Sequence, residues 1–168
     1  MKKLMTIGYE GAKLEDFVAT LQKADVTVLI DIREIPASRK PGFSKRSLSK
    51  SLENAGLKYV HLRELGDPKL GREAARRGDF ATFEHIFRTH LQSENAQRAL
   101  EEAINISFDT TACLLCFERN YQHCHRAIVA EEISVRSTID VRHLGVRHGL
   151  ATELQPRGIR DDKIHAIG

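Results

Sequence analysis

Apolar residues along the chain follow two spacings, one typical of buried strands and the other of amphipathic helices. Short aliphatic runs predict strands over residues 4–7, 26–30, 57–62, 111–116 and 138–144. Between these runs apolar residues recur three or four positions apart, which predicts helices over about residues 14–24, 44–55, 80–91, 96–104 and 124–133. The polar stretch from Gly66 to Gly78 is predicted to be irregular.

Strands that alternate with helices imply a parallel sheet with helices on both faces. We therefore predict an α/β fold, a single three-layer α/β/α domain of Rossmann-like type with a mainly parallel sheet. Residues 1–144 are predicted to form its core, and the polar residues 145–168 a C-terminal extension or tail. A chain of 168 residues is long enough to bury one such core.

Polar and charged side chains lie at the ends of the predicted strands or just after them. They are Tyr9, Asp31, Arg33, His61, Cys116, Glu118 and His143. Because ligands of such sheets bind beyond the carboxyl ends of the strands, these residues predict one site. Asp31 and Glu118 are the candidates for a general acid or base, and Tyr9 and His61 for orienting a ligand. The alternatives are ion pairs with neighbouring arginines for the carboxylates and simple packing for the two rings.

The loop after the second predicted strand concentrates positive charge. Its basic residues, with those of the following helix start, are Arg33, Arg39, Lys40, Lys45 and Arg46. Ser38 and the expected helix N-terminus at Ser44 add hydroxyl and N–H donors, so this segment suits a phosphate group. The alternative is a solvated basic loop, although cations at a helix N-terminus are unfavourable unless an anion joins them.

Cys124, His125 and Arg126 open the last predicted helix. The helix dipole favours a thiolate at Cys124, which makes it, with Cys116, a candidate nucleophile. His125 and Arg126 are predicted to contact an anion, and the alternative is a half-buried thiol beside a surface arginine. Neither cysteine is followed by an arginine at the spacing of a phosphatase or sulfurtransferase anion loop.

Cys113 and Cys116 form a C-x-x-C pair, which often binds zinc. Residues three apart on a strand face opposite ways, so Cys113 is predicted to be core filler and we assign no metal ligand. A metal or redox sensor using Cys116, Cys124 and a histidine is the weaker alternative. A disulfide between Cys116 and Cys124 is sterically conceivable but unusual in a cytosolic chain.

The composition and charge indicate the kind of ligand and the cellular location of the protein. The net charge of +3 makes the chain mildly basic, which suits an anionic ligand. This charge is smaller than that of a dedicated nucleic-acid-binding protein. No secretory segment follows Met1, no apolar run reaches membrane-spanning length, and three cysteines cannot all pair. We therefore expect a cytoplasmic protein without a membrane partner.

The motifs together resemble the domain-of-unknown-function family 488, a prokaryotic family without an established activity. The matching segments are Thr6–Gly11, Asp31–Arg33 with Pro36, Ser38 and Arg39, Gly42–Lys45, Tyr59–His61 with Leu65 and Gly66, and Leu115–Glu118 with Cys124–Arg126. The resemblance runs in order from Thr6 to Leu144 and implies an α/β fold with these residues at the family's motif positions. It supplies no reaction and no cofactor, and residues from 145 onward do not match.

Two functions follow from these observations. The first is an enzyme acting on a phosphate-bearing ligand, a nucleotide or a nucleic-acid base, at the carboxyl edge of the sheet. The second is a non-catalytic nucleic-acid-binding or regulatory module that uses the basic loop. Steep salt dependence of binding distinguishes the second from the first.

Overall fold

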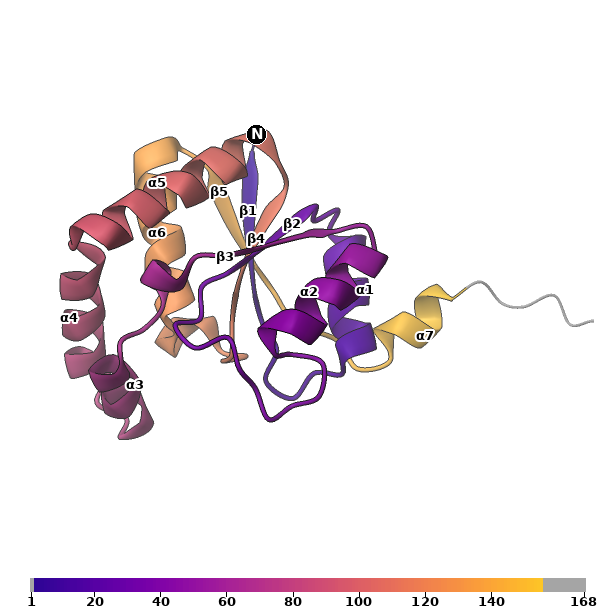
Figure 1. Ribbon diagram of the computed structural model, residues 1–168, viewed down its shortest axis with the longest axis horizontal. Coiled ribbons are helices and arrows are strands. Elements are labelled where there is room, and N and C mark those ends of the chain that lie inside the picture. Colours follow the sequence, from indigo (N-terminus) through magenta and orange to yellow (C-terminus); the bar gives the residue numbers. More distant parts are fainter. Residues whose placement is uncertain (1, 156–168) are drawn as a thin grey trace, which may run out of the picture.

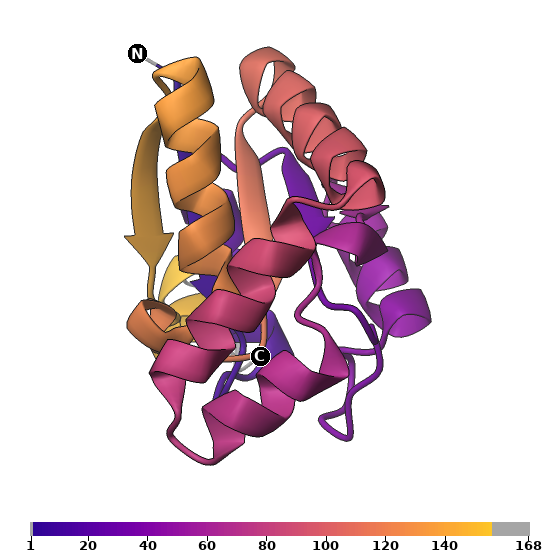
Figure 2. The same ribbon diagram turned by 90° about the vertical axis from the view of Figure 1, so that its left-hand side faces the viewer.

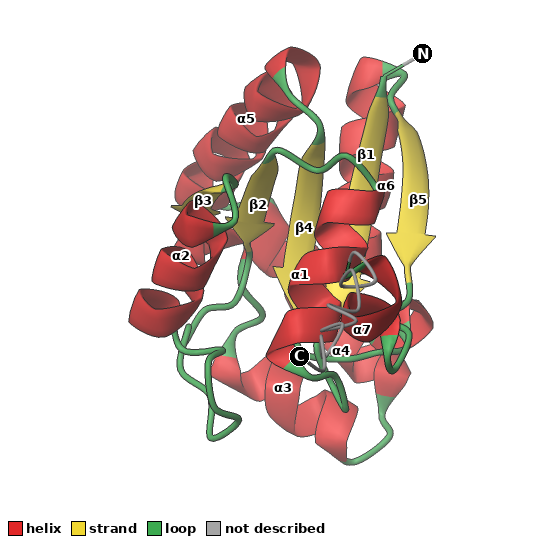
Figure 3. Ribbon diagram, turned by 90° about the vertical axis from the view of Figure 1, so that its right-hand side faces the viewer, coloured by secondary structure: helices red, strands yellow, loops and turns green. Residues whose placement is uncertain are grey.

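The computed structural model describes residues 2–155 and is built around one five-stranded sheet. Its strands are β1 (Lys3–Gly8), β2 (Val28–Asp31), β3 (Lys58–His61), β4 (Ala112–Cys116) and β5 (Asp140–Leu144). They lie in the order β3-β2-β4-β1-β5, and every neighbouring pair is parallel (Figure 3). The carboxyl ends of all five strands therefore meet at one edge.

Helices cover both faces of the sheet. On one face lie α1 (Leu14–Lys23) and α2 (Lys45–Asn54), and on the other lie α5 (Glu94–Asp109) and α6 (His125–Ser137) (Figure 1). This arrangement confirms the predicted three-layer α/β/α fold. Two further helices, α3 (Lys69–Arg76) and α4 (Phe80–Leu91), lie toward the carboxyl ends of the strands (Figures 2 and 3). Two short 3₁₀ turns, η1 (Arg63–Leu65) and η2 (Tyr121–His123), follow β3 and β4.

The central strand β4 contributes alternate residues to two apolar layers, as strand geometry requires. Leu114 packs with Phe87 in the layer that includes α4, α5 and α6. Cys113 and Leu115 face the opposite layer, where they pack with Phe17 of α1. All five residues of β4 are buried, which explains why this segment is a continuous apolar run.

The prediction of an irregular segment between Gly66 and Gly78 was wrong, because α3 occupies most of it. Only Gly71 and Ala74 of this helix are buried, so its apolar pattern is too weak to detect. Gly71 looks like a helix breaker in the sequence, yet here it allows close packing. A Cβ atom at this position would overlap Oδ1 of Asp67.

The chain beyond β5 returns to α1. The short helix α7 (Leu150–Leu154) lies against α1, and the Asp16 carboxylate accepts hydrogen bonds of 2.9 Å from the backbone N–H groups of Gly149 and Ala151. The rest of the predicted tail, residues 156–168, lies outside the described residues. The division of the chain at residue 144 therefore stays a prediction. Among the helices within residues 2–155, none combines the length and the apolar character needed to cross a membrane.

Candidate functional site

A pocket of about 710 Å³ opens where the loops after β1, β2 and β4 meet α3 and α4. The sequence predicted a site at this edge, and several of the expected residues line it. These are Tyr9, Arg33, Ser38, Arg39, Glu118, Cys124 and His125. Asp31, Lys45, His61, Cys116 and Arg126 are not among the lining residues.

Asp31 holds Arg33 in place from beneath the pocket. Its fully buried carboxylate accepts Arg33 Nη2–H at 2.7 Å, Arg33 Nε–H at 2.9 Å and the Tyr59 hydroxyl at 2.5 Å. The remaining Arg33 nitrogen, Nη1, donates to the Tyr9 hydroxyl and to the Phe43 carbonyl. Burial opposes the charge on Arg33, but the bonds with Asp31 outweigh it and raise the pKa of the guanidinium. Burial and the bond to Asp31 raise the pKa of Tyr59 as well.

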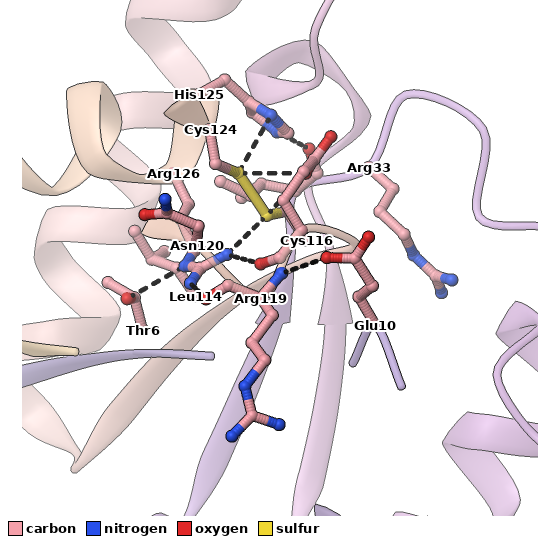
Figure 4. Close-up of a disulfide and its surroundings, with 12 residues drawn as sticks. Thr6, Glu10, Arg33, Leu114, Cys116, Arg119, Asn120, Cys124, His125 and Arg126 are labelled. Atoms are coloured by element: carbon pink, nitrogen blue, oxygen red, sulfur yellow. Dashed lines mark hydrogen bonds between the residues drawn. A yellow bond between two sulfur atoms is a disulfide. The ribbon is translucent and has the colours of Figure 1, made fainter. Parts of the chain in front are cut away.

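Arg126 differs from the sequence prediction that it contacts an anion. Its side chain is completely buried, does not line the pocket, and lies beside Thr6 and the loop after β4 (Figure 4). Nε donates to Thr6 Oγ1 at 3.1 Å, Nη1 to Cys116 Sγ at 3.0 Å, and Nη2 to the Arg119 carbonyl at 3.1 Å. Nη1 also donates to the Glu118 carbonyl. The guanidinium thus binds the loop after β4 rather than a ligand, and burial lowers its pKa.

Four groups with metal-binding chemistry gather at the start of α6. The Sγ atoms of Cys116 and Cys124 are within bonding distance, as in a disulfide, with their Cα atoms 7.6 Å apart (Figure 4). Glu118 Oε2 lies 3.2 Å from each sulfur, and His125 Nδ1 lies 3.8 Å from Cys124 Sγ. Burial lowers the pKa of His125 to about 4 and raises the pKa of Glu118.

The cysteines differ from the expected reactive thiols. Cys124 is buried and its sulfur contacts that of Cys116, so in this state neither is a free nucleophile. Cys113 faces the other side of β4, as its spacing predicted. It is a fully buried free thiol whose pKa is raised by desolvation.

The predicted basic loop divides into two parts. Ser38 and Arg39 line the pocket, whereas Lys45 lies outside it with Nζ 3.4 Å from His61 Nδ1. His61 Nε2 donates to the Arg33 carbonyl at 2.8 Å, so Nδ1 is the acceptor for Lys45. Ser44 is the N-cap of α2 by position, but its hydroxyl does not cap the helix. It accepts a hydrogen bond from the Ser38 backbone N–H and donates to the Ser38 carbonyl, which closes the loop.

The sequence did not predict a role for Asp67, which lines the pocket and is 7% exposed. Its Oδ1 is the one buried side-chain polar atom within residues 2–155 that has no hydrogen-bond partner. Burial raises the pKa of this carboxyl to about 7; Arg72 opposes the shift, whereas Glu118 and Glu34 increase it. The Gly-Asp-Pro sequence resembles an ordinary turn, so no local signal marks Asp67 as functional.

Aromatic rings form apolar walls around these charges. Tyr9 stacks on Phe43 at 4.6 Å between ring centroids, and Phe117 meets the edge of Tyr9 at 5.3 Å. Phe80, which also lines the pocket, stacks on His123 at 3.9 Å between ring centroids. Phe80 and Phe117 are 38% and 45% exposed, so both present ring surface at the pocket.

Arg72 and Arg76 of α3 add positive charge that the sequence analysis did not assign to the site. Arg72 Nη1 donates to the Asp67 carbonyl at 2.6 Å and forms an ion pair with Glu34. Arg76 and Arg39 are exposed and make no ion pair with a carboxylate of residues 2–155. The pocket therefore contains two arginines that are already paired with carboxylates, Arg33 and Arg72, and two exposed arginines that are not, Arg39 and Arg76.

Comparison with known proteins agrees with the resemblance seen in the motifs. Residues 13–133 match a family described as Domain of unknown function DUF488. No curated protein and no solved structure matches the chain. The matched segment covers most of the sequence and includes all of the pocket-lining residues except Tyr9 and Glu10, so this chain belongs to the DUF488 family.

Proposed function

We propose that the pocket binds a phosphate-bearing ligand, a nucleotide or a nucleotide unit of nucleic acid, and that the protein is an enzyme that acts on it by acid–base chemistry. The observation that carries this proposal is the buried carboxyl of Asp67, which lines the pocket with one oxygen unpartnered. An unsatisfied buried carboxyl oxygen is costly, and such cost is found where a group has a functional partner.

The walls of the pocket suit the two parts of a nucleotide. Arg39 and Arg76 form no ion pair within residues 2–155, and the planar guanidinium group can donate two hydrogen bonds to phosphate oxygens. Phe80 and Phe117 offer exposed ring faces and edges of the kind on which bases stack. Asp67 lines the same pocket, and its backbone carbonyl accepts a hydrogen bond from Arg72, so its carboxyl would transfer a proton to or from the bound ligand.

The other expected residues take supporting roles in this proposal. Asp31 fixes Arg33, and Arg33 fixes the Tyr9 hydroxyl at the pocket wall. Asp31 is thus a positioning residue rather than the acid or base. A buried free thiol at Cys113 suits a reducing compartment, so we place this activity in the cytoplasm.

The test is calorimetric titration of the full chain with nucleoside monophosphates and triphosphates, with the parent nucleosides and inorganic phosphate as separate arms. The Arg76→Gln variant should bind nucleotide about ten-fold more weakly or worse, because one charge-assisted bond contributes about 1.5–3 kcal/mol. Arg77→Gln is the matched control, since Arg77 is the exposed neighbour outside the pocket. Equal affinities of these two variants, or no nucleotide binding, would contradict the proposal.

Catalysis is tested with Asp67→Asn. This variant should retain nucleotide binding but lose the conversion of the bound ligand, followed by mass spectrometry of the ligand after incubation. If the wild-type protein converts none of the nucleotides that it binds, the acid–base role is refuted.

The exposed part of the basic loop favours a second candidate, a nucleic-acid-binding module without catalysis. Lys45 and Arg46 are exposed beside the pocket and outside it. In that case oligonucleotide affinity should fall steeply with salt and should be reduced by Lys45→Gln, while Asp67→Asn has no effect.

A further inference from the structure

We propose that Cys116, Glu118, Cys124 and His125 bind one zinc ion. One ligand atom from each of these residues lies within 4.8 Å of every other. The residues come from the end of β4, the loop after it and the start of α6. Figure 4 labels three of them, Cys116, Cys124 and His125. Neither the family assignment nor the proposed acid–base function assigns an ion here.

The spacing of the ligand atoms is close to that of a tetrahedral zinc site. Zinc bonds of about 2.3 Å to sulfur and about 2.0 Å to oxygen or nitrogen place neighbouring ligand atoms about 3.5 Å apart. The corresponding separations are 3.2 Å from Glu118 Oε2 to each sulfur and 3.8 Å from Cys124 Sγ to His125 Nδ1. The two sulfurs must move apart, to about 3.8 Å, to admit the ion.

The backbone separation of the two cysteines also favours an ion between them. Their Cα atoms are 7.6 Å apart. Ordinary disulfides span about 4.4–6.8 Å between Cα atoms, and pairs beyond about 7 Å need backbone movement before they can be bridged. Two zinc–sulfur bonds replace one sulfur–sulfur bond in a metal site, so a wider backbone separation is accommodated there.

Hydrogen bonds with neighbouring groups orient His125 and favour a thiolate at Cys116, as metal binding requires. His125 Nε2 lies 2.8 Å from the Ile32 carbonyl, which can only accept, so Nε2 carries the proton and Nδ1 keeps its lone pair toward Cys124. A histidine ligand is commonly oriented by such a carbonyl. On the other side Arg126 Nη1 donates to Cys116 Sγ at 3.0 Å, an arrangement that stabilises a thiolate.

The charges balance when zinc is present. Two thiolates and the Glu118 carboxylate carry three negative charges, and zinc with the buried Arg126 carries three positive ones. Buried charges require such pairing. Thiolate with imidazole and carboxylate selects zinc over magnesium or calcium, which take oxygen ligands. With four protein ligands the ion would tie the loop after β4 to the start of α6 and leave Asp67 as the acid–base group of the pocket.

The test measures zinc in the full chain, purified with reducing agent and passed over a sizing column after reconstitution with one equivalent of ZnCl₂. We expect one zinc per chain in the wild type and in Cys113→Ala, the matched control on the opposite face of β4. Cys116→Ser and Cys124→Ser should retain less than about a tenth of it. Zinc absent from the wild type, or equal in all four proteins, would overturn the proposal.

A measurement on the wild type alone avoids variants that fail to fold. Zinc should slow alkylation of Cys116 and Cys124 in the reduced protein at least about ten-fold, as followed by peptide mass spectrometry, and cobalt should give the visible absorption of a tetrahedral thiolate complex. Unchanged alkylation with zinc, or a persistent Cys116–Cys124 disulfide in the reductant, would refute the site. Asp67→Asn and Arg76→Gln should keep their zinc, so failure of the nucleotide proposal is read separately.

Discussion

Replacing Arg126 with methionine should destabilise the protein strongly, although the sequence predicts that this residue contacts an anion. Methionine keeps most of the side-chain volume but removes every donor. The acceptors that lose their partner are Thr6 Oγ1, Cys116 Sγ and the carbonyls of Glu118 and Arg119.

The magnitude follows from the two carbonyl bonds. A hydrogen bond from a charged group contributes about 1.5–3 kcal/mol, so these two contribute about 3–6 kcal/mol. Removing the buried guanidinium also removes its desolvation cost, which offsets part of the loss. We expect the free energy of unfolding to fall by about 3–4 kcal/mol, and the melting temperature by about 6–16 °C for a chain of this size.

The assay is urea unfolding followed by circular dichroism, with the slope m compared between variants so that a change in midpoint can be assigned to stability. Arg119→Met is the matched control, because its guanidinium is exposed and points away from the cluster in Figure 4. This control should lie within about 0.5 kcal/mol of the wild type. An Arg126→Met variant within about 1 kcal/mol of the wild type would show that the guanidinium does not hold the loop after β4.

Three further predictions concern other positions. Gly8→Ala should lower the free energy of unfolding by about 3 kcal/mol in urea titrations, because its Cβ would overlap the Glu118 carbonyl, whereas Gly145→Ala, with open space around it, should be nearly neutral. The Asp67 carboxyl has a pKa raised to about 7 by burial, so it stays protonated in the folded state while the unfolded chain ionises. Wild-type stability should therefore fall between about pH 4 and pH 7, and Asp67→Asn should remove that fall; parallel pH profiles of the two proteins would contradict the assignment. The pKa of Asp16 is lowered by the backbone bonds from Ala151 and Gly149, so its contribution to stability is present above the ordinary carboxyl pKa and is lost as pH falls through the lowered one. Asp16→Asn should weaken this pH dependence in acid unfolding, and an unchanged acid transition would exclude the contact with α7.

The sequence predicted the sheet and most helices because their apolar spacing is strong. Strand β4 is a clear case, since its five buried residues form an unbroken apolar run. Its period of two also placed Cys113 and Cys116 on opposite faces. Helix α3 was missed because Gly71 and Ala74 supply almost no apolar signal, and the reason for the glycine is a tertiary contact with Asp67.

Side-chain roles in the site were harder to predict than positions. Arg126 and Asp31 lie at the expected edge, but their partners come from residues distant in sequence, Thr6 and Tyr59 among them. Whether a charged group faces a pocket or the interior depends on those partners. Asp67 was missed for the same reason. Its Oδ1 is buried without a hydrogen-bond donor, and this becomes visible only once the chain is packed.

The place of β1 in the sheet has a practical consequence for expressing parts of this chain. The family match covers residues 13–133, which omits both β1 and β5. Yet β1 lies between β4 and β5, and its pairing with β4 buries one edge of that strand. A fragment cut at the family limits would expose the entirely apolar edge of β4, which is the type of strand that pairs with other chains. Such a fragment should aggregate, and β1 supplied as a separate peptide is the reagent that would keep it in solution.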